Sequence, residues 1–175
     1  MWNLDNSTKN KAIFLDRDWT LNYDFTYVYK LEDLKILNGA KEWLELLKNM
    51  WYKLIIVTNQ SGIKRWYYTM DECNKFNEEL EKQLWIKFDD IYICPHLSEE
   101  NCECRKPKTL FIEKAIEKFN LDISKCYFIW DKESDIQTWI NAWCKTVLIK
   151  NDQYECNIMP DCYAENIVSF AKLLK

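Results

Sequence analysis

Short apolar runs alternate with amphipathic, helix-like stretches along most of this chain, and several runs end at a polar residue. Three such ends are Asp16 after residues 12–15, Thr58 after residues 54–57, and Asp131 shortly after residues 127–129. Continuous apolar runs of this length are typical of strands buried on both faces of a sheet. Strands that alternate with helices form parallel sheets with helices on both faces. The pattern therefore predicts a three-layer, Rossmann-like α/β fold.

The expected elements follow the chain in this alternating order. Strands are predicted at 12–15, 54–57, 91–94, 127–129 and 146–149, and helices at 40–50, 69–84, 109–119 and 135–142. Thr69 and Glu72 have the spacing of a capping box, which marks the start of the second helix. Residues 151–162 are expected to form a loop and residues 164–175 a closing helix. A single domain over residues 1–175 is predicted, with its core at about 11–150.

Charge and hydropathy exclude two classes of partner. The net charge is −4 and the sequence pI is near 5.2, and no segment carries the clustered Lys and Arg that would follow a nucleic-acid backbone. The first eleven residues lack the apolar run of a signal peptide, and no segment approaches the roughly 18 apolar residues of a membrane span. We therefore expect a cytoplasmic, monomeric protein that binds neither nucleic acid nor membrane.

Two carboxylates, Asp16 and Asp18, follow the first expected strand. Ligands of open parallel sheets bind beyond the carboxyl ends of the strands, so both side chains belong to the expected site. Hydrolysis of a phosphate monoester through a covalent intermediate needs a carboxylate nucleophile and a separate acid/base. Asp16 is the expected nucleophile and Asp18 the expected acid/base. The same spacing also occurs in solvated turns, so the pair does not define the chemistry by itself.

Four segments together resemble the four motifs of the haloacid-dehalogenase phosphatases. They are Phe14–Asn22, Val57–Gly62, Cys104–Pro107 and Asp131–Asp135. Within that superfamily the set is similar to the D,D-heptose 1,7-bisphosphate phosphatases and the related histidinol-phosphate phosphatases, from about Ala12 to Ile149. The resemblance implies a Mg²⁺-dependent phosphatase. No insertion between Asp18 and Thr58 is long enough for a separate cap domain, so we expect an open site that accepts a small phosphorylated molecule such as a sugar bisphosphate.

The resemblance also implies roles for individual residues. Thr58 and Lys106 would contact the transferring phosphoryl group, and Asp16, the backbone carbonyl of Asp18, and Asp131 would bind Mg²⁺. The implied substrate-binding residues are Asp24, Tyr27, Asn59, Gln60, Ser61, Arg105 and Lys132. These roles agree with elementary chemistry, because fixed cations stabilise phosphoryl oxygens and hard oxygen ligands suit magnesium.

Cysteine and the only histidine cluster in one short segment. Cys94 and His96 form one close pair, and Cys102 and Cys104 form another. Three thiolates and an imidazole make up a tetrahedral zinc set. Because protein ligands fill all four positions, the expected zinc is structural and stabilises the loop that carries Arg105. A chance grouping of buried thiols is the alternative.

Three functions remain open at this point. A heptose bisphosphate phosphatase is favoured by the segments Thr58–Gly62, Tyr67–Met70 and Asn22–Tyr29, which are expected to shape the substrate pocket. A histidinol-phosphate phosphatase is favoured by the segment Cys94–Leu97 and by the short spacer between the two metal-binding pairs. A catalytically inactive module stabilised by zinc is the third alternative.

The chain has nine Trp and two Gly, whereas an average chain would have roughly 7% Gly. Seven Trp lie where the resembled families usually have Gly: Trp19, Trp51, Trp66, Trp85, Trp130, Trp139 and Trp143. Some bacteria read the codon UGA as glycine, so these residues are Gly in the native protein if the gene was translated with the wrong codon table. The alternative is that the tryptophans are real. This alternative is harder to exclude for the other two, Trp2 and Trp43.

Overall fold

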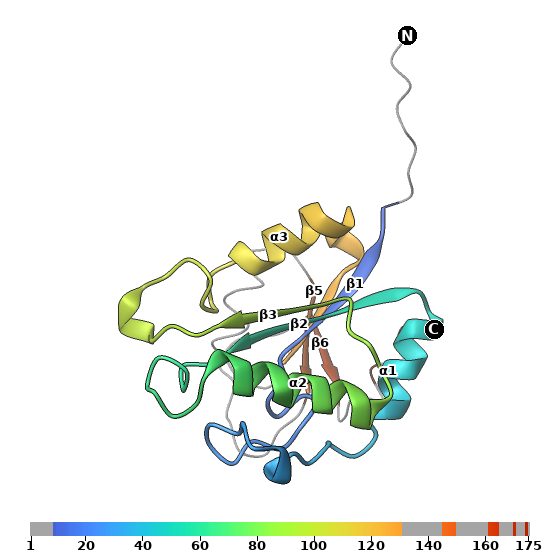
Figure 1. Ribbon diagram of the computed structural model, residues 1–175. Helices are drawn as coiled ribbons and strands as arrows, with labels where there is room; N and C mark the ends of the chain where they lie inside the picture. Colours follow the sequence, from blue (N-terminus) through green and yellow to red (C-terminus); the bar gives the residue numbers. More distant parts are fainter. Residues whose placement is uncertain (1–8, 131–144, 150–160, 165–169, 171–173, 175) are drawn as a thin grey trace.

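The computed structural model describes residues 9–130, 145–149, 161–164, 170 and 174. The strands in these ranges form one six-stranded parallel sheet (Figure 1). Its strands are β1 (Lys11–Leu15), β2 (Tyr52–Asn59), β3 (Asp90–Cys94), β4 (Tyr127–Trp130), β5 (Lys145–Ile149) and β6 (Cys162–Ala164). Their spatial order is β3-β2-β1-β4-β5-β6. The first five strands confirm the predicted ones, and each strand end lies within two residues of its predicted position.

The prediction for the last part of the chain is wrong at β6. Residue 162 was expected in a loop and residue 164 in a helix, but both pair in parallel with β5. The start of β6 is fixed by a distant contact, since the Asp161 carboxylate accepts hydrogen bonds from the backbone N–H and the hydroxyl of Thr146 at 2.8 Å. A strand of three residues is too short to show a period of two in the sequence.

Within the part of the chain that the structure describes, three α-helices cover the two faces of the sheet: α1 (Ala40–Asn49), α2 (Met70–Leu84) and α3 (Leu110–Phe119). Figure 1 shows α3 on one face and α1 and α2 on the other. Short 3-10 turns, η1 (Leu31–Asp33), η2 (Ser98–Glu100) and η3 (Ile123–Lys125), lie in the connections. The capping box of Thr69 and Glu72 is present at the start of α2, as predicted. The helix expected at 135–142 lies outside the described residues.

Alternate residues of the strands enter two hydrophobic cores. Ile13 and Leu15 of β1 belong to the core under α1 and α2, whereas Ala12 and Phe14 belong to the core under α3. All four are fully buried, and each large apolar side chain contributes about 1.5–3 kcal/mol by leaving water. Both faces of β1 are therefore fixed, and Asp16 has a defined place at the end of the strand.

The strand order places the expected site at a topological switch point. The chain proceeds from β1 to β2 and β3 in one direction and to β4 and β5 in the other, so the connections diverge at the carboxyl ends of β1 and β4. Between Asp18 and Thr58 the chain forms η1, α1, β2 and loops, with no separate cap domain in this described stretch. Within the described ranges, no helix has the length and apolar character that a membrane span requires.

Candidate active site

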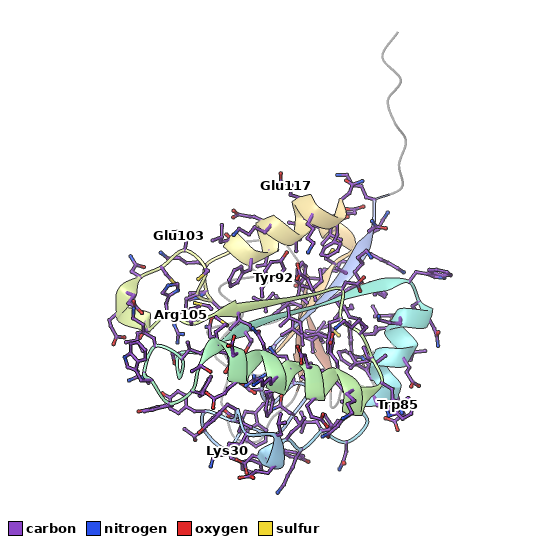
Figure 2. All side chains as sticks on the ribbon, in the orientation of Figure 1. Lys30, Trp85, Tyr92, Glu103, Arg105 and Glu117 are labelled. Atoms are coloured by element: carbon purple, nitrogen blue, oxygen red, sulfur yellow. The ribbon has the colours of Figure 1, made fainter. Side chains whose placement is uncertain are left out.

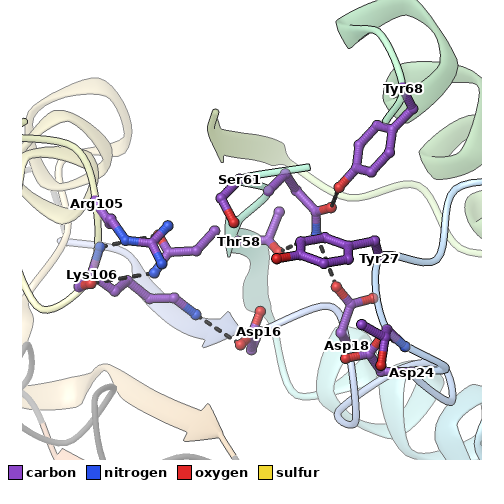
Figure 3. Close-up of a pocket in the computed structure, with 12 residues that line it drawn as sticks. Asp16, Asp18, Asp24, Tyr27, Thr58, Ser61, Tyr68, Arg105 and Lys106 are labelled. Atoms are coloured by element: carbon purple, nitrogen blue, oxygen red, sulfur yellow. Dashed lines mark hydrogen bonds and ion pairs between the residues drawn. The ribbon is translucent and has the colours of Figure 1, made fainter. Parts of the chain in front are cut away.

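A pocket of about 290 Å³ lies at this edge of the sheet (Figure 3). Its lining contains ten residues that the sequence marked: Asp16, Asp18, Asp24, Tyr27, Thr58, Asn59, Gln60, Ser61, Arg105 and Lys106. Thr26 and Tyr68 also line it and were not predicted. Asp131 and Lys132 lie outside the described residues. The fold thus brings together side chains from β1, β2 and the loop before α3.

Asp16 and Lys106 form a buried ion pair in this pocket. Lys106 Nζ lies 2.9 Å from Asp16 Oδ2, and the backbone N–H of Arg17 donates to Asp16 Oδ1 at 2.7 Å. Asp16 is 8% exposed and Lys106 is 3% exposed. Charges interact more strongly at such a site than in water, so a lysine at this position stabilises negative charge close to the carboxylate.

The Asn59 side chain is hydrogen-bonded to the backbone of Lys106. Its side-chain oxygen accepts from the Lys106 N–H at 3.1 Å, and its side-chain nitrogen donates to the Lys106 carbonyl at 3.3 Å. Because Asn59 ends β2, this pair of hydrogen bonds connects the central sheet to a loop that lies far away in the sequence. The lysine position therefore depends on β2 as well as on its own loop.

Asp18 is held by Arg17, a fully buried arginine for which the sequence predicted no role. Arg17 Nε and a terminal Arg17 nitrogen contact the two oxygens of the Asp18 carboxylate at 2.9 and 3.0 Å, and Asn22 donates to the same carboxylate at 3.0 Å. Burial alone would raise the pKa of Asp18, but the ion pair with Arg17 and the hydrogen bonds from Asn22 and Gln60 hold that pKa below its usual value. Asp18 is therefore ionised at neutral pH in this arrangement.

Three further polar contacts of the pocket meet at Gln60. Its side-chain nitrogen donates to Asp18 Oδ2 and to Thr58 Oγ1, both at 2.9 Å, and its side-chain oxygen accepts from the Tyr68 hydroxyl at 2.6 Å. Figure 3 shows Tyr68 approaching this group from the loop that precedes α2. The sequence marked only the segment around Tyr68, because a contact between residues from separate loops leaves no local pattern.

The four metal-ligand candidates of the cysteine segment also come together. The ligand atoms of Cys94, His96, Cys102 and Cys104 all lie within 4.8 Å of one another. Sulfur–sulfur distances of 3.3, 3.6 and 3.7 Å are close to the roughly 3.8 Å expected between ligands on a tetrahedron with Zn–S bonds of about 2.3 Å. Burial and the neighbouring Cys104 thiol raise the pKa of Cys94, and a cation bound at this cluster would favour the thiolate form of Cys94.

This cluster is joined to the pocket by Arg105. One terminal nitrogen of Arg105 donates to the backbone carbonyl of His96 at 3.0 Å, while Arg105 itself lines the pocket. The cysteine segment therefore sets the position of a pocket residue, in addition to closing its own loop.

Two carboxylates in one polar pocket, one paired with a buried lysine and the other with a buried arginine, are the features of a hydrolase that transfers phosphoryl groups. The sequence model of the family described as haloacid dehalogenase-like hydrolase matches residues 5–142. The chain belongs to this family, and it is a phosphoric monoester hydrolase.

Known relatives agree with this assignment. The chain is 42% identical to the D-glycero-beta-D-manno-heptose-1,7-bisphosphate 7-phosphatase of Helicobacter pylori, over 81% of this chain and 84% of that protein. It is 44% identical to the D-glycero-alpha-D-manno-heptose-1,7-bisphosphate 7-phosphatase of Campylobacter jejuni, over 83% of this chain and 85% of that protein. The crystal structure of D,D-heptose 1,7-bisphosphate phosphatase from B. bronchiseptica, complexed with magnesium and phosphate, has the same fold, with a TM-score of 0.85 and 23% identity over 94% of this chain and 97% of that one.

Proposed function

We propose that this protein is a Mg²⁺-dependent phosphatase that removes the 7-phosphate of D-glycero-D-manno-heptose 1,7-bisphosphate through an aspartyl-phosphate intermediate. The observation that carries the proposal is the high identity, over most of the chain, to relatives named for this reaction. The pocket supports it, because its polar lining holds the cationic Arg105 and Lys106 beside the carboxylates, and no cap covers it within the described stretch from Asp18 to Thr58. One sheet carries all the described strands, which supports a single domain over residues 1–175.

In the first step Asp16 attacks phosphorus, so that a bond forms between its carboxylate oxygen and phosphorus while the bond from phosphorus to the sugar oxygen breaks. The departing oxygen takes a proton from the minor, protonated form of the Asp18 carboxyl group. In the second step water attacks the acyl phosphate, Asp18 accepts its proton, and inorganic phosphate and free Asp16 result. The ionised form of Asp18 that Arg17 favours is the form required in the second step. Thr58 and Lys106 bind the phosphoryl oxygens.

The pocket residues fit a magnesium ion. The Asp16 carboxylate and the backbone carbonyl of Asp18 offer hard oxygen ligands just beyond the carboxyl end of β1. Asp131, outside the described residues, completes the proposed set. When bound, Mg²⁺ neutralises charge on the phosphoryl oxygens. We also propose a structural zinc at Cys94, His96, Cys102 and Cys104.

A phosphate-release screen tests the substrate. The α and β anomers of the heptose bisphosphate, histidinol phosphate and a set of other sugar phosphates are assayed with Mg²⁺ and with EDTA. We expect a heptose bisphosphate to exceed histidinol phosphate in kcat/KM by roughly 100-fold, because a site that bonds several substrate hydroxyls discriminates against a molecule that lacks them. EDTA is expected to stop turnover. A preference for histidinol phosphate would assign the chain to the other branch.

Loss of the zinc is expected to weaken both stability and activity. In Cys102→Ser, zinc content should fall below one ion per chain, and the unfolding midpoint should drop by roughly 10 °C, which corresponds to roughly 3 kcal/mol. Phosphate release should fall as well, because Arg105 is bonded to His96. Zinc analysis and thermal unfolding measure these effects. Cys162→Ser is the matched control, since Cys162 lies outside the cluster. Equal midpoints for the two variants would contradict the zinc assignment.

A further inference from the structure

We propose that Tyr68 is a positioning residue for phosphoryl transfer, which acts through Gln60 on Asp18 and Thr58. The inference rests on the proposed function, in which Asp18 exchanges protons and Thr58 binds the phosphoryl group. The Gln60 amide connects them, because it bonds to both Asp18 and Thr58 through its nitrogen and to the Tyr68 hydroxyl through its oxygen.

The amide orientation of Gln60 is what the tyrosine fixes. A carboxylate only accepts hydrogen bonds, so the amide nitrogen must face Asp18, and the amide oxygen then points to the other side. There it accepts from the Tyr68 hydroxyl at 2.6 Å. Gln60 is 3% exposed, so without this donor its oxygen would lack a hydrogen bond at a place that bulk water hardly reaches. An orphaned buried acceptor favours a shift of the side chain, and such a shift would move both bonds of the amide nitrogen.

Tyr68 is itself firmly placed. It is 4% exposed, and its ring stacks on Tyr29 with the centroids 4.8 Å apart. A Cβ atom at Gly62 would lie 2.2 Å from a ring carbon of Tyr68, so only glycine allows the ring to take this position. Burial raises the pKa of Tyr68, which keeps the hydroxyl protonated as a donor. The close approach of Gly62 and the stacking on Tyr29 thus fix the Tyr68 hydroxyl within hydrogen-bond distance of the Gln60 amide oxygen.

The test is Tyr68→Phe, which keeps the ring and removes only the hydroxyl. We expect kcat to fall about tenfold with KM within about twofold, because misplaced reacting groups slow chemistry more than binding. Tyr92→Phe, which removes a hydroxyl from a tyrosine that stacks on Phe111 and does not line the pocket, should behave like the unmodified enzyme. In a Gln60→Ala background, Tyr68→Phe should have no further effect, because its route to the site is already lost.

The two possible failures are distinguishable. If the unmodified enzyme does not hydrolyse a heptose bisphosphate, the substrate assignment fails, and the same comparison is made with an aryl phosphate. If Tyr68→Phe matches the unmodified enzyme in kcat, or if its effect is unchanged in the Gln60→Ala background, the positioning role is overturned.

A second inference stands on backbone conformation. Four tryptophans have positive φ angles: 60° at Trp19, 64° at Trp51, 63° at Trp66 and 57° at Trp85. They make up four of the eight non-glycine residues with positive φ in the described ranges. The left-handed region is costly for any residue with a Cβ, and only a few per cent of non-glycine residues adopt it. Chance does not explain its concentration in one bulky residue type.

Exposure of the same side chains points in the same direction. Trp51, Trp66 and Trp85 are 87%, 90% and 81% exposed, although indole is among the side chains that gain most from burial. Figure 2 shows Trp85 at the surface beyond the end of α2. These three indoles therefore contribute little packing that would offset their backbone conformation.

The places of these residues in the fold are typical of glycine. Trp85 is the left-handed cap of α2, and its N–H donates back to the carbonyl of Lys82 at 3.2 Å. Trp51 follows α1, and its N–H donates to the carbonyl of Lys48 at 2.9 Å. Glycine is the residue most favoured at such helix ends.

We infer that residues 19, 51, 66 and 85 are glycine in the protein made by its own cell, and that the gene has UGA at these codons, read there as glycine. Trp43 is different, because it lies in the regular helix α1 and is 1% exposed, and its backbone gives no preference for glycine. Trp2, Trp139 and Trp143 lie outside the described residues.

Mass spectrometry of the protein purified from the cell that carries the gene tests this inference, together with the nucleotide sequence. Peptides that span the four positions should have the mass of glycine at each, and the codons should be UGA. Tryptophan in these peptides, or UGG at these codons, would overturn it.

Discussion

Asp16→Asn is expected to lower phosphate release by on the order of 10³-fold or more while the fold is retained. An amide cannot take the place of the carboxylate that forms the bond to phosphorus, and loss of a covalent nucleophile is among the largest single effects in enzymes. The variant also lacks the negative partner 2.9 Å from Lys106. The Lys106 charge can still bind phosphate, but binding alone cannot maintain turnover without the nucleophile. Steady-state phosphate release and acid-quench trapping of labelled phosphoenzyme measure the loss, and the label should be absent from the variant.

Asp89→Asn is the matched control for this experiment. Asp89 also pairs with a lysine, at 2.8 Å from Lys53, but it is not part of the pocket lining. This control should therefore lose an ion pair and keep its turnover. Circular dichroism and zinc content establish that both variants are folded. If Asp16→Asn retained turnover close to that of Asp89→Asn, Asp16 would not be the nucleophile, and the proposed aspartyl-phosphate mechanism would fail.

The edge of the sheet at which the site lies could be predicted because strand ends have a local signature. An apolar run that stops at a polar residue locates Asp16 and Thr58, and parallel strands bring such ends together. The strand β6 could not be predicted in this way, because three residues show no period and its place depends on Asp161 bonding to Thr146.

The partners within the pocket could not be predicted from the sequence either. Gln60 was predicted to bind substrate, and that remains a prediction; the structure shows its amide bonded to Asp18, 42 residues away in the sequence, and to Tyr68. Arg17 resembles any surface arginine in sequence, yet it is fully buried and its guanidinium group lies 4.6 Å from the Phe76 ring centroid. The contact of Arg17 with Phe76 arises only when α2 packs against the sheet. Local patterns therefore indicate where chemistry occurs, but they do not show which side chains hold the reacting groups.

Changing the four left-handed tryptophans to glycine is expected to stabilise the chain that carries them. A residue with a Cβ loses roughly 1–2 kcal/mol in the left-handed region, and the greater freedom of glycine in the unfolded chain offsets part of this gain. We expect a net gain of about 1 kcal/mol at each position, or about 4 kcal/mol for the quadruple variant, since separate sites add. The unfolding midpoint should rise by roughly 8–16 °C.

Two contacts oppose this gain and are smaller than it. Trp19 meets Tyr23 edge to face with the centroids 5.7 Å apart, and Lys41 lies 5.1 Å from the centre of the Trp85 ring. An exposed cation–π contact contributes about 0.5–1 kcal/mol, so Trp85→Gly should show the smallest gain among the three exposed positions. Chemical denaturation of each single variant measures the individual contributions.

Asn120 provides the control that isolates the backbone effect. It caps α3 in the same left-handed region as Trp85 caps α2, with φ of 48° against 57°. Asparagine tolerates this conformation, so Asn120→Gly should change the free energy of unfolding by only a few tenths of a kcal/mol. Trp85→Ala removes the indole but keeps a Cβ, so it should recover little of the gain of Trp85→Gly. If alanine and glycine stabilised the chain equally, the exposed indole would be the cause, and the backbone argument for glycine at these positions would fail.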